Sequence, residues 1–143
     1  MSDASLTVAS QTGASNARVL LLIGSTVDAD AQIKAALELL QLEFSIAAKS
    51  ARYQSLAAGP VDAPSYLNQA VLISTPLDRV ALKPRLRGIE ARLGRERPAV
   101  DPRLCPIDID AIACLEGSLT IWDEKSFAAS YAQAPIADVL DRV

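Results

Sequence analysis

Histidine is absent from this sequence of 143 residues, and cysteine and aromatic residues are scarce. Without histidine, the chain cannot use a Ser-His-Asp triad, a Cys-His dyad, a histidine-bound zinc ion or an imidazole acid–base group. Its two cysteines, Cys105 and Cys114, are too few for a disulfide framework or a four-cysteine zinc site. Aromatic residues make up only 4% of the chain, so its core must be aliphatic and rich in alanine.

Long hydrophobic runs and an excess of basic residues are also missing. The densest apolar run, residues 19–23, is far shorter than the ~20 residues that cross a bilayer. Residues 1–16 lack the basic and apolar regions of a secretory signal. The net charge of −3 argues against a general nucleic-acid binder. We therefore expect a cytoplasmic protein with reduced thiols, a monomer or weak homodimer, that binds neither nucleic acid nor membranes.

The overall composition predicts one folded domain. Half of the residues are hydrophobic and 22% are charged, which excludes disorder across the whole chain. Residues 1–17 are rich in Ser, Ala and Thr without helical or strand periodicity, so we expect a disordered tail there. Residues 18–143 then form a single domain, since the chain length suits one core.

The hydrophobic pattern predicts alternating strands and helices. Continuous or alternating apolar runs indicate strands, whereas spacings of three and four residues indicate helices. We expect strands at 18–23, 44–55, 66–75, 107–115 and 118–121, helices around 33–40, 77–93 and 136–140, and loops at 56–64 and 95–106. The order βαββαβ is that of a ferredoxin-like α+β fold, with two helices on one face of an antiparallel sheet and a short C-terminal appendage.

The helix expected at 77–93 has two features of its own. Its apolar stripe is predicted to consist of Val80, Leu86, Ile89 and Leu93. Pro84 lies inside it and is expected to kink the helix or split it near Lys83, because proline removes a backbone donor.

Two aspartates in the run Ile107-Asp108-Ile109-Asp110 are the strongest chemical feature of the sequence. Residues two apart on a strand share a face, so Asp108 and Asp110 point the same way and the isoleucines point the other way. Paired carboxylates repel unless a cation neutralises them, and Mg²⁺ takes few carboxylates and completes its shell with water and phosphate. The alternative is a solvated outer face of an edge strand.

Basic residues gather in one part of an otherwise acidic chain. Eight of the 14 lysines and arginines fall within residues 79–103, namely Arg79, Lys83, Arg85, Arg87, Arg92, Arg95, Arg97 and Arg103. Guanidinium groups bind phosphate oxygens in pairs, so a basic loop beside an aspartate strand indicates a polyphosphate substrate. A solvated helix face is the alternative for the helical residues.

Tyr66 and Asn68 open the strand at 66–75. A tyrosine ring stacks on a flat heterocycle, and an amide on the same face pairs with its edge by hydrogen bonds. An ordinary core tyrosine and a structural asparagine are the alternative.

Short landmarks follow one another along residues 18–135: an aliphatic strand ending in Gly24-Ser25, then Arg52-Tyr53-Gln54-Ser55, Pro64-Ser65-Tyr66-Leu67-Asn68, Ile89-Glu90, Leu93-Gly94-Arg95-Glu96-Arg97 and Ile107-Asp108-Ile109-Asp110. In their order and spacing these landmarks resemble the 6-hydroxymethyl-7,8-dihydropterin pyrophosphokinase family. The family is a ferredoxin-like domain that transfers pyrophosphate from ATP to the pterin hydroxymethyl group in folate biosynthesis and releases AMP.

The resemblance implies a role for each matched residue. Asp108 and Asp110 would hold two Mg²⁺ ions that bridge the ATP phosphates. Glu90, Arg95 and Arg97 would lie beside the nucleotide, with Arg95, Arg97 and Arg103 taking part in catalysis. Ser55 and Asn68 would bond the pterin edge, with Tyr66 against its face and Phe127 as the second stacking ring.

The sequence also departs from the family's pattern. The family's Asn after Gly-Ser is Thr26, its loop arginine falls on Cys105, the arginine before its phenylalanine is Ser126, and its Pro-His after the aspartate strand is absent. Three hypotheses therefore remain: an active Mg²⁺-dependent pyrophosphokinase, a catalytically degenerate relative that binds a pterin or nucleotide without turnover, and a ferredoxin-like interaction domain.

Overall fold

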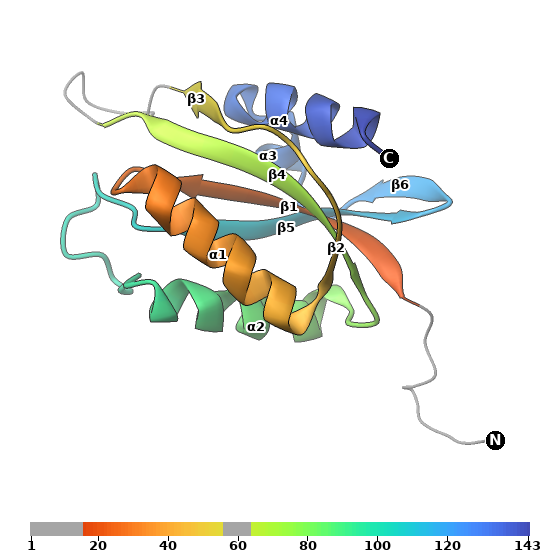
Figure 1. Cartoon of the computed structure of the whole chain (residues 1–143), viewed down its shortest axis with the longest axis horizontal. Coiled ribbons are helices and arrows are strands. Elements are labelled where there is room, and N and C mark those ends of the chain that lie inside the picture. The colour runs from red at the N-terminus through yellow and green to blue at the C-terminus, as the bar shows by residue number, and fades with distance from the viewer. Residues whose placement is uncertain (1–15, 56–63) are drawn as a thin grey trace.

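The computed structural model describes residues 16–55 and 64–143, which form one antiparallel sheet with helices on both faces (Figure 1). The sheet has the order β2-β4-β1-β5-β6, and β3 also pairs with β4. Its strands are β1 (Ala17–Ser25), β2 (Ser45–Lys49), β3 (Tyr53–Ser55), β4 (Tyr66–Thr75), β5 (Asp108–Glu116) and β6 (Ser118–Ile121). Its helices are α1 (Ala29–Glu43), α2 (Arg79–Arg92), α3 (Glu124–Ala128) and α4 (Ser130–Asp141).

The central strand β1 divides the core into two layers. Its residues alternate between faces, as the pleat of a strand requires. Leu21 and Ile23 pack with α1 and α2, whereas Leu20 and Leu22 pack with α4 on the opposite face. Burial on both faces explains why this segment is a continuous apolar run rather than an alternating one.

The architecture confirms the expected α+β ferredoxin-like order. α1 and α2 cover one face of the sheet, and the C-terminal appendage, α4, packs across the other (Figure 1). Among the described residues, no helix is both long and apolar enough to cross a membrane. The expected tail and the expected loop at 56–64 lie almost wholly outside the described residues, and β1 already begins at Ala17.

The strand expected at 44–55 is two strands. β2 pairs with one end of β4 and β3 with the other, and the register of β2 shifts between Ile46 and Ala48. Between them Ser50 fastens the chain to β4, since its hydroxyl accepts a hydrogen bond from the Ala70 N–H (3.0 Å). The predicted antiparallel pairing with β4 is confirmed.

Three details of α2 differ from expectation. The helix begins at Arg79, because the Asp78 side chain caps it by accepting from the Ala81 N–H (2.8 Å). Val80 is 83% exposed, so its place in the apolar stripe was wrong; Leu82 is buried instead, about 200° further round the helix. Pro84 does not split the helix, which runs unbroken from Arg79 to Arg92 with Pro84 on its exposed side.

Candidate active site

β5 presents two carboxylates on one face of the sheet. Ile107 and Ile109 are buried in the layer below α1 and α2, and Asp108 and Asp110 point the other way, as the alternation predicted. The two aspartates line the same cavity. Burial, followed by the neighbouring Asp108 carboxyl, raises the pKa of Asp110 well above its ordinary value. The repulsion between two such carboxylates is reduced either when they share a proton or when a cation binds between them.

A cavity of about 550 Å³ opens on the face that carries these carboxylates. It is large enough for a bicyclic heterocycle, because ligand pockets commonly begin near ~300 Å³. Its walls come from β1, β3, β4, β5 and the start of α4, and are formed by Leu22, Gly24, Ser55, Tyr66, Asn68, Asp108, Asp110, Ala129, Ser130 and Tyr131. Five residues expected at the site thus meet in one cavity: Ser55, Tyr66, Asn68, Asp108 and Asp110.

The polar wall of this cavity is organised around Asn68. Its amide nitrogen donates to the Ser55 hydroxyl (2.8 Å), and its side chain is almost fully buried. Gly24 faces it from β1, and a Cβ there would lie 3.2 Å from the Asn68 Oδ1 and 3.3 Å from the Tyr66 ring. Burial, with a smaller contribution from Cys105, raises the pKa of Tyr66 to about 12, so its hydroxyl stays protonated.

A second, smaller cavity of about 130 Å³ lies between α2 and β5. Its wall carries three cationic side chains, Arg79, Lys83 and Arg87, together with the acidic residues Asp110 and Asp123. Asp110 lines both cavities, so the two spaces meet at this carboxylate. Anions of the size of a phosphate chain are attracted to the smaller cavity by the three cations.

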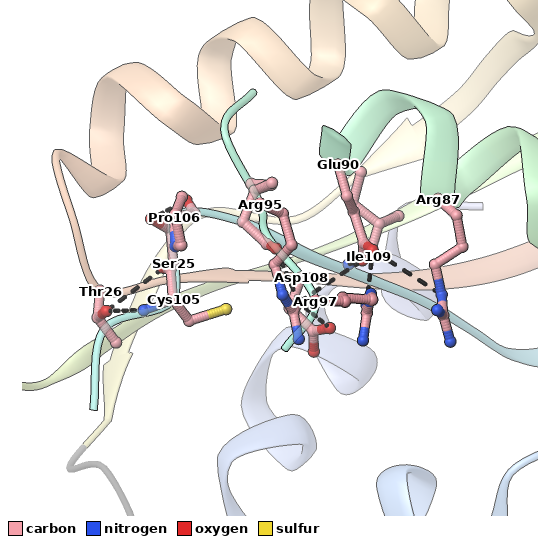
Figure 2. A network of polar contacts seen from close by, with 11 residues as sticks. Ser25, Thr26, Arg87, Glu90, Arg95, Arg97, Cys105, Pro106, Asp108 and Ile109 are labelled. Atoms are coloured by element: carbon pink, nitrogen blue, oxygen red, sulfur yellow. Dashed lines mark hydrogen bonds and ion pairs between the residues drawn. The ribbon is translucent and has the colours of Figure 1, made fainter. Parts of the chain in front are cut away.

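Glu90 is the buried centre of a network on the α2 side of β5 (Figure 2). One of its oxygens accepts from the Ile109 N–H (2.8 Å), and the other accepts from Arg97 (2.8 Å). Arg87 and Arg95 lie within 3.9 Å and 3.8 Å of the same carboxylate. Glu90 is 1% exposed, and these contacts supply the compensation that a buried charge requires.

The residues that precede Asp108 are fastened at three consecutive carbonyl groups (Figure 2). The Thr26 N–H donates to the Cys105 carbonyl (2.9 Å), Ser25 donates to the Pro106 carbonyl (2.6 Å), and Arg95 donates to the Ile107 carbonyl (2.9 Å). Thr26 also accepts from the Cys105 N–H (2.7 Å). The start of β5, and with it Asp108, is therefore held by the end of β1, the residue after it and Arg95.

The other expected site residues lie outside the two cavities. Arg103 pairs with Asp101 in the loop before β5, and Phe127 packs against the apolar cluster beneath α4. Neither contributes to the cavity walls described above. The basic segment of the sequence pointed to three of the residues that line the smaller cavity, Arg79, Lys83 and Arg87. Tyr131, which lines the larger cavity, was not predicted, because an isolated tyrosine in an alanine-rich segment forms no recognisable pattern.

The aspartate pair suits Mg²⁺ by the chemistry of its oxygen donors. Within residues 16–55 and 64–143, no group of three or more His, Cys, Asp or Glu side chains is arranged to hold a metal ion. Mg²⁺ does not need such a group when substrate phosphates are present, because one or two carboxylates plus phosphate and water complete its shell. Asp108 and Asp110 fit that requirement.

The fold and the site define an α+β domain in which a strand-borne carboxylate pair borders two cavities that share Asp110. The chain belongs to the family described as 7,8-dihydro-6-hydroxymethylpterin-pyrophosphokinase, whose model matches residues 20–141. A comparison with curated proteins gave no match. The family supports pyrophosphate transfer in folate biosynthesis as the general activity, with a pterin and ATP as its small-molecule substrates.

Proposed function

We propose that this chain transfers the pyrophosphoryl group of ATP to the hydroxymethyl oxygen of 6-hydroxymethyl-7,8-dihydropterin. The observation that carries the proposal is the shared wall: Asp110 belongs to both the larger cavity and the cationic one. A transfer reaction needs donor and acceptor to meet at one point, and the carboxylate pair marks that point.

The larger cavity takes the acceptor in this proposal. Tyr66 supplies an aromatic face, and the bonded pair Asn68 and Ser55 supplies donors and acceptors for the edge of a heterocycle. Because Asn68 is buried and already oriented by Ser55, little conformational entropy is lost when the ligand binds.

The cationic cavity takes the triphosphate. Its charge is neutralised by Arg79, Lys83 and Arg87. Two further cations, Arg95 and Arg97, contact the Glu90 carboxylate. Arg103 lies further along the same loop, and its part in catalysis stays a prediction, as does that of Phe127 in acceptor binding. Mg²⁺ held by Asp108 and Asp110 would supply further neutralisation of the charge on the phosphate oxygens.

The chain's own residues have a positioning task in this reaction. A bond forms between the hydroxymethyl oxygen and the β-phosphorus, the bond from that phosphorus to the AMP oxygen breaks, and the hydroxyl proton is released. Phosphoryl transfer relies on alignment and charge neutralisation more than on a strong base. A site without histidine is therefore adequate for it.

The test is AMP formation from ATP and 6-hydroxymethyl-7,8-dihydropterin in the presence of Mg²⁺. We expect AMP to form with the wild-type chain and to require both substrates. Asp110→Asn and Asp108→Asn are expected to reduce the rate at least about a hundredfold, since each removes a charge from the carboxylate pair. A wild-type rate no higher than that of Asp110→Asn would overturn the proposal.

A second candidate, ligand binding without turnover, is favoured by one observation. The position of the family's loop arginine is Cys105, whose thiol is buried and whose pKa is raised by burial, so it brings no positive charge. Calorimetry with the pterin and with a non-hydrolysable ATP analogue separates the two candidates. Binding of either ligand without AMP formation would establish the second candidate. If calorimetry detects binding of neither ligand, the second candidate is excluded.

A further inference from the structure

A bulge divides the pairing between β1 and β5 into two halves. The register shifts between Leu20 and Leu21, which leaves Ile112 without a partner on β1. Because a bulge inserts an extra residue, the half of the ladder after it does not dictate the exact position of the half before it. The half that carries the site carboxylates ends where Gly24 lies opposite Asp108. Asp108 thus belongs to the outermost pair of a short ladder, and its position depends on the residues that precede it.

The buried isoleucines at the start of β5 set only the coarse register of this half. Side chains alternate along a strand, so a slip of one residue would turn the carboxylates toward α1 and α2 and would expose two isoleucines. Ile107 and Ile109 are buried in that layer, and their burial prevents a full slip. The finer placement of the Asp108 carboxylate relative to that of Asp110 requires an anchor before the strand begins.

Thr26 binds both backbone polar groups of Cys105 (Figure 2). Its hydroxyl accepts from the Cys105 N–H (2.7 Å) and lies 3.3 Å from the Cys105 carbonyl oxygen, to which the Thr26 N–H donates (2.9 Å). Cys105 is buried, so water does not readily replace a lost bond to its N–H. Ser25 and Arg95, by contrast, each bind one carbonyl group in the residues that follow. Thr26 therefore fixes the orientation of this segment as well as its position.

The two bonded residues are also two of the positions at which the sequence departs from the family's pattern. The family's asparagine is Thr26 and its loop arginine falls on Cys105, and these positions lie 79 residues apart in the chain. The Cys105 side chain brings no positive charge to the site. Position 105 therefore acts on the site through its backbone, and the Thr26 hydroxyl is the side-chain group that holds that backbone.

We propose that Thr26 is a positioning residue for the metal site, whose hydroxyl fixes the start of β5 so that the carboxylates of Asp108 and Asp110 are aligned for one cation. The inference rests on the proposed function for the role of the carboxylates and adds the residue that aligns them. Thr26 lies outside the described linings of both cavities, so it acts through Cys105. Mg²⁺ demands near-ideal octahedral geometry, which makes its binding sensitive to the relative placement of two carboxylates.

The experiment measures Mn²⁺ affinity by calorimetry without nucleotide, pterin binding by fluorescence, and kcat in the AMP assay. Thr26→Val keeps the shape of the side chain but lacks the hydroxyl, and is expected to weaken Mn²⁺ binding about three- to tenfold and to lower kcat at least as much. Pterin binding is expected to stay within about twofold of wild type, because Asn68 and Ser55 lie on other strands. Thr26→Ser keeps the hydroxyl and is expected to restore both Mn²⁺ affinity and kcat. Thr26→Ala, a second variant without the hydroxyl, is expected to behave like Thr26→Val.

Thr75→Val is the matched control for the loss of a threonine hydroxyl. The Thr75 hydroxyl accepts from the Leu77 N–H (3.1 Å), and Thr75 is buried at the end of β4 that pairs with Ala17, the opposite end of β1 from Thr26. This variant removes the same kind of bond away from the site, so we expect its Mn²⁺ affinity to match wild type. A loss of Mn²⁺ affinity as large as that of Thr26→Val would show that general loosening of the sheet is responsible, and would overturn the assignment.

The remaining outcomes separate this inference from the function on which it rests. If Thr26→Val and wild type bind Mn²⁺ equally well and form AMP at the same rate, the role of Thr26 is overturned and the proposed function stands. A Thr26→Ser variant as weak as Thr26→Val also overturns the role of the hydroxyl. A wild-type chain that neither binds Mn²⁺ nor forms AMP overturns the proposed function and this inference together.

Discussion

Arg95 holds one of the two site carboxylates: its guanidinium donates to the Asp108 Oδ1 at 3.0 Å and to the Ile107 carbonyl at 2.9 Å. The same nitrogen lies 3.8 Å from Glu90. In the ligand-free chain, a cationic side chain thus partly neutralises the carboxylate pair. A divalent cation that binds Asp108 must displace this contact or share the carboxylate with it.

We therefore predict that Arg95→Ala binds divalent cations more tightly than wild type while turning over more slowly. Loss of the competing guanidinium is expected to strengthen Mn²⁺ binding without nucleotide about three- to tenfold, since part-exposed ion pairs are worth about 1 kcal/mol. Calorimetric titration with Mn²⁺ measures the change in affinity, and the AMP assay measures the expected slower turnover.

Arg97→Ala is the matched control for the Mn²⁺ titration. Arg97 contacts the same Glu90 carboxylate at 2.8 Å, but its described contacts do not include Asp108. Its Mn²⁺ affinity is expected to equal that of wild type. If Arg95→Ala and wild type bind Mn²⁺ equally, the guanidinium does not compete with the metal.

A second prediction concerns the buried carboxylate of Glu90. Glu90→Gln removes its charge but keeps a side chain of the same size, so Arg97 and the Ile109 N–H lose their charged acceptor. We expect the free energy of unfolding to fall by about 1–3 kcal/mol, measured by urea denaturation. Glu96→Gln, an exposed change in the adjacent loop, is expected to stay within about 0.5 kcal/mol of wild type. Equal stability of the two variants would mean that the network does not depend on the charge of Glu90.

A third prediction tests the close approach of β1 to the acceptor wall. In Gly24→Ala the new Cβ lies 3.2 Å from the Asn68 Oδ1 and 3.3 Å from the Tyr66 ring, so both side chains must shift by a few tenths of an ångström. We expect the acceptor KM to rise about three- to tenfold with the ATP KM unchanged, because positioning errors of this size weaken aligned contacts.

Gly88→Ala is the control for a glycine substitution without such contacts. A Cβ at Gly88 meets nothing within 4 Å, and the residue lies inside α2. This variant is expected to keep its acceptor KM and to gain about 0.5–1 kcal/mol of stability, as alanine is the better helix former. An unchanged acceptor KM in Gly24→Ala would show that the wall tolerates the added methyl group.

Local pattern was sufficient for the parts of the fold and site that depend on local geometry. The alternation of Asp108 and Asp110 with two isoleucines placed the carboxylates on one face, because the period of a strand is two. The apolar run of β1 indicated a strand buried on both sides for the same reason. Tyr66 and Asn68 were indicated by their place on one strand face, and Ser55 by the resemblance alone; β3 and β4 do bring the three together.

Contacts between distant segments were beyond the reach of local pattern. Nothing in the sequence indicates that Arg95 bonds Asp108 or that Tyr131 reaches the cavity, since both contacts depend on how a loop and α4 pack against the sheet. Val80 shows the same limit inside one helix: its apolar side chain suggested burial, but Leu82, Leu86 and Ile89 set which face meets the sheet. Tertiary packing decided each of these cases.

The last prediction concerns the attachment of α4, which carries Tyr131. The Asp138 carboxylate accepts from Arg142 (2.6 Å), the Tyr53 hydroxyl (2.8 Å) and the Ala51 N–H (2.9 Å), so it joins α4 to the edge of the sheet. These contacts, led by the one with Arg142, lower the pKa of Asp138 to about 2. A carboxylate with a lowered pKa in the folded state stabilises that state above its ordinary pKa, and this stability is lost as the pH falls toward about 2.

In Asp138→Asn the decrease in unfolding free energy between about pH 4 and pH 2 is therefore expected to be shallower than in wild type, as measured by urea denaturation at each pH. Asp141→Asn removes an exposed carboxylate from the same helix and is expected to keep the wild-type slope. Identical slopes for Asp138→Asn and wild type would show that this carboxylate does not fasten the helix to the sheet.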